Sequence, residues 1–130
     1  MTELDNFLSR LNSVADHSEI VERQETLSKK VTTAKLRYHL IDGSYVDVFV
    51  NIILDKYYYH WQRADGKIYR INNYPPEGWH EHLDTEDNRH PIKRIEPEDF
   101  FYKIKSILER KNARRKKRGT EAQRHKGNRG

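Results

Sequence analysis

The spacing of hydrophobic residues changes along the chain, and this spacing predicts the order of its helices and strands. Near the N-terminus, apolar residues recur at helical intervals and predict an amphipathic helix over about residues 3–14. These residues are Leu4, Phe7, Leu8 and Leu11. Thr2 is placed to cap this helix, with Asp5 as a loose match to a capping box. Residues 18–26 fit neither period well, and we expect a strand there.

From residue 31 onward apolar and polar residues alternate, which is typical of strands with one buried face. The alternation predicts strands over residues 31–40, 45–53, 57–63 and 67–72. Turn sequences at residues 42–43 and 64–67, each containing glycine, lie between them. Because successive strands are joined by short turns, the pattern predicts an antiparallel meander.

The alternation ends after residue 72. Pro75-Pro76 and Gly78 predict that residues 73–89 form a long loop. Residues 92–95 are expected to form a short edge strand. A second helix is predicted to begin at Pro97, because proline is well tolerated in the first helical turn. The apolar stripe of this helix consists of Phe100, Phe101, Ile104, Ile107 and Leu108.

Together these elements predict one α+β domain over residues 1–108, in which the two helices pack on one face of an antiparallel β-meander of four to six strands. The sequence contains no cysteine, which excludes disulfides and thiolate metal sites. It has neither an apolar run near the ~20 residues of a membrane span nor a secretory signal pattern. A cytoplasmic protein is therefore expected.

The net charge of +5 is unevenly distributed. Residues 109–130 carry a net charge of +8, whereas residues 1–108 carry −3. We expect this basic tail to be disordered and to attract phosphates by counterion release. A solubilising role and contact with an acidic partner are the alternatives. Consecutive cations favour nucleic-acid contact, and they are Arg114, Arg115, Lys116, Lys117 and Arg118.

Residue types suited to chemistry are concentrated between residues 57 and 82, which hold both tryptophans, three of seven histidines and five of eight tyrosines. His80 and His82 are two positions apart, so their imidazoles point to the same side of an extended segment. Histidine is the usual general acid and base near neutral pH. His60 joins this pair as a candidate because it shares a strand face with Gln62.

Cleavage of RNA without a metal needs a base, an acid and cationic groups for the developing phosphate charge. Arg63 and Arg70 are the candidates for phosphate, and Trp79 is a candidate for stacking on a base. Two alternatives stay open for the histidine pair. The pair could be surface residues of a polar loop, or it could bind a metal together with His90 or Glu81.

Several of these segments resemble the TumE-like toxins of toxin–antitoxin operons. They are Tyr59-His60-Trp61-Gln62, Asp65-Gly66-Lys67, Ile68-Tyr69-Arg70-Ile71-Asn72-Asn73 and His80-Glu81-His82. The resemblance covers about residues 3–108. Where the family pattern has Asp-Asn-Ala-Pro-His, this chain has Asn72-Asn73-Tyr74-Pro75-Pro76, so an aspartate and a loop histidine are replaced.

The resemblance implies a small α+β toxin that acts on RNA or translation and pairs with a helix-turn-helix antitoxin. We therefore predict a metal-independent endoribonuclease without a cofactor, with histidine acid–base catalysis. Asn73 enters the candidate site through the resemblance alone. The alternative is a non-catalytic nucleic-acid-binding module that uses the basic tail and the loop aromatics. A homodimer is a further option that the sequence leaves open.

Overall fold

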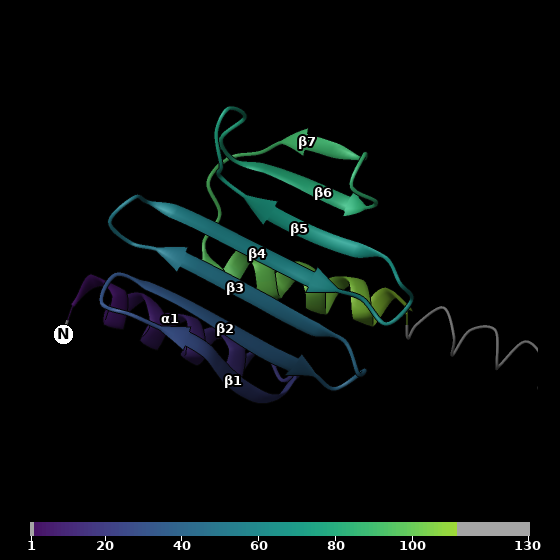
Figure 1. Cartoon of the computed structure of the whole chain (residues 1–130). Coiled ribbons are helices and arrows are strands. Elements are labelled where there is room, and N and C mark those ends of the chain that lie inside the picture. The colour runs from purple at the N-terminus through teal and green to yellow at the C-terminus, as the bar shows by residue number, and fades with distance from the viewer. Residues whose placement is uncertain (1, 112–130) are drawn as a thin grey trace, which may run out of the picture.

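A seven-stranded antiparallel sheet, in which each strand pairs with the next in the chain, forms the centre of the fold (Figure 1). The structure is a computed structural model that describes residues 2–111. The strands are β1 (Val21–Lys29), β2 (Thr33–Leu40), β3 (Tyr45–Asn51), β4 (Lys56–Gln62), β5 (Ile68–Asn72), β6 (His80–Asp84) and β7 (Arg89–Pro91). The helix α1 (Glu3–His17) precedes the sheet, and a C-terminal helix over residues 97–111 follows it.

Both helices lie on the same side of the sheet, behind it in Figure 1. The strand residues that meet them are buried and apolar, and they are Ala34, Leu36, Tyr38, Leu40, Val46, Val48, Val50, Tyr57, Tyr59, Trp61, Tyr69 and Ile71. The helices complete this core with Leu4, Leu8, Leu11, Ala15, Phe100, Phe101 and Ile104. The other side, here called the open face, carries the alternate residues of each strand. The predicted α+β fold with both helices on one face is confirmed.

Aromatic contacts attach the C-terminal helix to the middle of the sheet. The ring of Phe100 lies 5.1 Å from that of Tyr59 and is stacked on Tyr69 at 5.4 Å. Phe101 meets Tyr38 edge-on at 5.5 Å. Because these rings come from three different strands, the helix holds β2, β4 and β5 in one core.

The predicted elements before residue 72 are present, with shifted ends. α1 is longer than predicted, and the capping box of Thr2 and Asp5 is complete. β1 begins and ends later than the expected strand over residues 18–26. Gly43 and Gly66 adopt positive φ angles of 87° and 83° in the two predicted turns, a conformation that glycine takes without a steric cost.

The prediction was wrong about residues 73–89 and about the number of strands. The sheet has seven strands rather than four to six, because β6 forms inside the expected loop and β7 begins at its end. β6 was missed because Glu81 is polar although it lies on the helix-covered face, where its carboxylate accepts a hydrogen bond from the Tyr69 hydroxyl at 3.0 Å. Residues 92–95 form no strand; Ile92 and Ile95 pack against the core from an irregular segment.

Within residues 2–111, no helix is long and apolar enough to cross a membrane. The consecutive cations at positions 114–118 lie outside the described residues.

The fold predicts a large difference between two aromatic residues of the C-terminal helix. Phe100→Ala removes a fully buried ring, and we expect the free energy of unfolding to fall by about 3–5 kcal/mol. Tyr102→Ala is the matched control, since Tyr102 is 77% exposed, and it should change stability by less than about 0.5 kcal/mol. Denaturant titration of both variants measures the difference, and equal losses of stability would contradict the burial of Phe100 between the helix and the sheet.

Candidate functional site

The register of the sheet aligns one residue from each strand across the open face. Each of these residues is the direct cross-strand partner of the next, and we call the set the transverse row. Its members are Glu25, Arg37, Asp47, His60, Arg70, His82 and Arg89. Direct partners on neighbouring strands have their Cβ atoms about 5 Å apart. Three of the residues predicted from the sequence, His60, Arg70 and His82, are therefore consecutive in the row.

Asp47 is fixed beside His60 by an ion pair with Arg37. The Arg37 guanidinium donates to both carboxylate oxygens of Asp47, at 2.7 and 2.9 Å. It also lies over the ring of Tyr45, 4.2 Å from its centroid. This bidentate geometry holds the carboxylate in one orientation. Neither Arg37 nor Asp47 was singled out in the sequence, although the alternation of β2 and β3 places both on the open face.

His60 is half-buried in the middle of the open face. Its ring is nearly parallel to that of Tyr58, at an interplanar angle of 3°, and its Nδ1 lies 3.3 Å from the Tyr58 hydroxyl. Burial lowers the pKa of His60 below the ordinary histidine value, and a hydrogen bond with Gln62 opposes this shift. The imidazole is therefore neutral at pH 7 and able to accept a proton.

Arg70, His82 and Glu86 form a hydrogen-bonded group at the next two positions of the row. His82 Nδ1 lies 2.7 Å from the carbonyl oxygen of Glu86, and its Nε2 lies 3.1 Å from an Arg70 nitrogen. A carbonyl only accepts and a guanidinium only donates, so Nδ1 carries the proton and Nε2 accepts. The Arg70 guanidinium also pairs with the Glu86 carboxylate.

One donor of this group lacks a partner. Arg70 Nε is buried and makes no hydrogen bond to any residue of the described chain. Leaving a buried donor unpaired costs about 1–3 kcal/mol.

His80 and His82 lie together, as expected from their spacing, but on a strand rather than in a loop. Their rings meet edge-on with centroids 5.0 Å apart. His80 donates from Nδ1 to the carbonyl of Gly78 at 2.7 Å, and only 8% of the residue is exposed. Its Nε2 faces the Glu77 carboxylate at 3.7 Å. The pair is therefore enclosed by protein contacts.

An aromatic hollow of about 530 Å³ lies on the open face beside His60. It is lined by Lys35, Tyr45, Asp47, Phe49, Tyr58, His60 and Tyr74. The Lys56 amine lies above the Tyr74 ring, 5.7 Å from its centroid. Tyr45 and Phe49 were not predicted as site residues; the alternation of β3, which places both on the open face with Asp47, is the signal that could have found them.

The other predicted site residues are divided between the two faces. Gln62 is on the open face, two positions from His60. Arg63 lies on the helix-covered side and forms ion pairs with Asp65 and Asp84. Trp79 is stacked on Tyr57 at 6.0 Å and packs against the core.

Asn73 has a structural role in the turn region. Its side chain accepts from the backbone N–H of Tyr57 at 2.9 Å and donates to the carbonyl of Asp55 at 2.6 Å. These bonds tie the end of β5 to the start of β4. The same reading applies to Asn72, which accepts from the backbone N–H of Tyr74 at 3.1 Å. Asn72 thus bonds the backbone next to it in the chain, whereas Asn73 bonds the backbone of a neighbouring strand and of the turn before it.

The metal alternative does not match the geometry of β6 and β7. Glu81 and His90 are cross-strand partners of each other, on the face opposite His80 and His82. No group of three or more metal-ligating side chains is present within residues 2–111.

The fold and the transverse row define a small α+β protein with one helix-covered sheet face and one open face rich in arginine, histidine and tyrosine. The family model described as Toxin TumE matches residues 5–115, and the chain belongs to this family. It is thus the toxin component of a toxin–antitoxin system, and the family implies an antitoxin partner. No curated protein and no solved structure matches the chain significantly.

The contacts of His82 predict its tautomer. In ¹⁵N NMR spectra at mildly alkaline pH, Nδ1 should be protonated and Nε2 should not, because the Glu86 carbonyl accepts from the first and Arg70 donates to the second. Arg70→Met should leave the proton on Nδ1, since the Glu86 carbonyl is unchanged. A dominant Nε2–H form in the unmodified protein would contradict the hydrogen-bond network.

Proposed function

We propose that this toxin acts on RNA and cleaves it endonucleolytically, without a metal, on the open face of the sheet. The observation that carries the proposal is the transverse row, in which a half-buried neutral histidine and an arginine are direct cross-strand partners. Such a pair offers a proton acceptor and a phosphate-binding cation on side chains whose Cβ atoms are about 5 Å apart. These are the two groups that attack of a ribose 2′-hydroxyl on its own phosphate requires.

His60 is the general base in this mechanism. Its neutral imidazole takes the proton of the 2′-hydroxyl, whose oxygen then bonds to the adjacent phosphorus. The bond from phosphorus to the 5′-oxygen breaks, and the imidazolium returns the proton to that oxygen. The products are a 2′,3′-cyclic phosphate and a 5′-hydroxyl end, so protons and electron pairs balance without a cofactor.

Arg70 stabilises the phosphate charge. His82 positions the Arg70 guanidinium through the hydrogen bond to its Nε2. The carboxylate of Glu86 pairs with the guanidinium in the free protein and is half exposed in the turn between β6 and β7. A substrate phosphate would replace this carboxylate and accept from the same end of the guanidinium. His80 supports the arrangement through its edge-on contact with His82. In this proposal His60 alone carries the acid–base role that the sequence suggested for His80 and His82, and these two histidines position Arg70.

The aromatic hollow is suited to hold an unpaired base next to the scissile phosphate. Tyr58 and Tyr74 are 6.1 Å apart and both line it. Stacking on such rings contributes about 1–3 kcal/mol per base in single-strand binders and tolerates any sequence. We therefore expect single-stranded RNA to be preferred over duplex.

Two parts of this function rest on the sequence alone. The basic tail, with Arg114, Arg115, Lys116, Lys117 and Arg118, would steer RNA through its charge. The antitoxin is proposed to be a helix-turn-helix protein. The reading frame next to the toxin gene tests the proposed antitoxin, because this frame should encode a helix-turn-helix protein.

Purified toxin should cleave single-stranded RNA in the presence of EDTA and leave 2′,3′-cyclic phosphate ends. His60→Ala should lower the single-turnover rate by about 10²–10⁴-fold, the usual contribution of a general base. His17→Ala is the control, since His17 is an exposed residue at the end of α1. RNA that is bound but not cleaved by the unmodified toxin would favour the non-catalytic binding module instead.

The lowered pKa of His60 predicts the pH dependence of cleavage. Burial disfavours the imidazolium, so the neutral base persists to lower pH and the acid limb of the rate profile should fall below the ordinary histidine value of about 6.5. The hydrogen bond with Gln62 favours the imidazolium, so Gln62→Ala should move this limb to still lower pH. An acid limb above 6.5 would argue against His60 as the base.

A further inference from the structure

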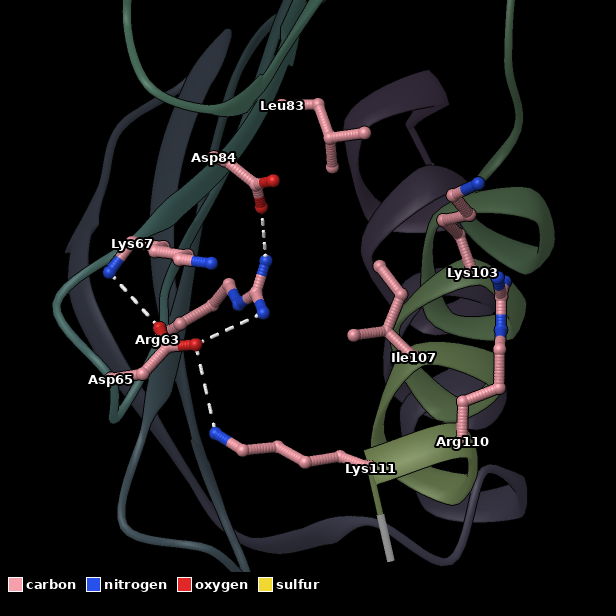
Figure 2. Close-up of a pocket in the computed structure, with 9 residues that line it drawn as sticks. All are labelled: Arg63, Asp65, Lys67, Leu83, Asp84, Lys103, Ile107, Arg110 and Lys111. Atoms are coloured by element: carbon pink, nitrogen blue, oxygen red, sulfur yellow. Dashed lines mark hydrogen bonds and ion pairs between the residues drawn. The ribbon is translucent and has the colours of Figure 1, made fainter. Parts of the chain in front are cut away.

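A second hollow lies on the helix-covered side of the sheet, separate from the transverse row. It has a volume of about 380 Å³ and lies between the turn after β4, the end of β6 and the C-terminal helix. Figure 2 shows Arg63, Asp65, Lys67 and Asp84 on the sheet side and the residues of the helix opposite them. Its lining consists of Arg63, Asp65, Lys67, Leu83, Asp84, Lys103, Ile107, Arg110 and Lys111.

Arg63 is held rigidly at the wall of this hollow. Its guanidinium donates to Asp84 at 2.6 Å and to Asp65 at 3.0 Å, and it lies 5.3 Å from the ring centroid of Trp61. Only 12% of its side chain is exposed. A buried and doubly paired guanidinium keeps its position without an entropic cost on ligand binding.

The two carboxylates of the hollow are already neutralised by protein cations. Lys111 lies 3.6 Å from Asp65, in addition to the contact with Arg63. Burial acts to raise the pKa of Asp65, but the backbone N–H of Lys67 and the charges of Arg63 and Lys111 outweigh it and lower this pKa. Asp65 is therefore ionised and fully engaged at neutral pH.

Among residues 2–111, the remaining cations of the hollow have no anionic partner. Within residues 2–111, neither Lys67 nor Lys103 forms an ion pair, and Arg110 donates to the neutral hydroxyl of Ser106 at 3.1 Å. Five cations and two carboxylates leave the lining with a charge of +3. Leu83 and Ile107 add an apolar wall.

We propose that this hollow is a binding site for a phosphate group carried on a nucleoside. The uncompensated charge comes from separate side chains on both walls of the hollow, and cations of this kind bind phosphate through charge-assisted hydrogen bonds. The volume lies within the range of small-molecule sites, and the apolar wall is suited to a sugar or base. The phosphate can belong to a free nucleotide or to the 5′ end of an RNA strand. The site stands independently of RNA cleavage on the open face.

Titration of the ¹⁵N-labelled full-length protein at constant ionic strength tests the site. Inorganic phosphate and adenosine 5′-monophosphate should each give saturable shifts at the amides of residues 63–67 and 103–111. The double variant Lys67→Gln/Lys103→Gln should bind both ligands about tenfold or more weakly. Lys105→Gln, on the same helix but outside the hollow, should bind them normally.

The source of the phosphate is resolved with oligonucleotides in a His60→Ala background, where RNA is not consumed. Tighter binding of a 5′-phosphorylated strand than of a 5′-hydroxyl strand, lost in the double variant, identifies an RNA end. Binding of the mononucleotide alone identifies a free nucleotide. Phosphate binding that is unchanged in the double variant overturns the site, as does binding of a hexaglutamate peptide in place of phosphate. Absence of RNA cleavage by the unmodified toxin leaves each of these results intact.

Discussion

The packing of both helices against one face of the sheet is the constraint on which the rest of the structure depends. Because the aromatic core of Phe100, Tyr59 and Tyr69 lies on that face, strands β2 to β5 must present their apolar residues there. A shift of one residue in any of these four strands would turn its core side chains to solvent. The registers of these strands are therefore fixed by the core, and the central part of the transverse row, from Arg37 to Arg70, is a consequence of them.

Strands β2 to β5 and both helices could be predicted from the sequence because their patterns are local. Each apolar stripe or alternation is complete within its own segment, and the turns at Gly43 and Gly66 have recognisable sequences. β6 could not be predicted in this way. Its position facing the helices is held by a hydrogen bond from Tyr69 to Glu81, and such a tertiary contact leaves no hydrophobic signal in the strand.

Three residues of the candidate site, His60, Arg70 and His82, were predicted from the sequence, but the contacts between strands that arrange them were predicted only in part. The spacing of His80 and His82 indicated that their rings would be close, because it depends on one strand alone. Arg63 and Arg70 were predicted together because both are cations. The alternation of side chains along a strand places Arg63 on the face opposite His60 and Arg70. The contacts of Asp47 with Arg37, and of Arg70 with Glu86, join different strands or turns and require the registers to be known.

The division of cations between the two faces gives the molecule two independent electrostatic environments. On the open face, Arg37 and Arg70 are paired with Asp47 and Glu86, so their charges are balanced until a ligand displaces a carboxylate. Of these two carboxylates, Asp47 is nearly buried whereas the Glu86 side chain is 53% exposed. Displacing Glu86 from its guanidinium therefore costs less free energy than displacing Asp47, since an exposed carboxylate regains its hydration when it leaves. The Arg70 end of the row, rather than the Arg37 end, is where an anionic ligand can enter.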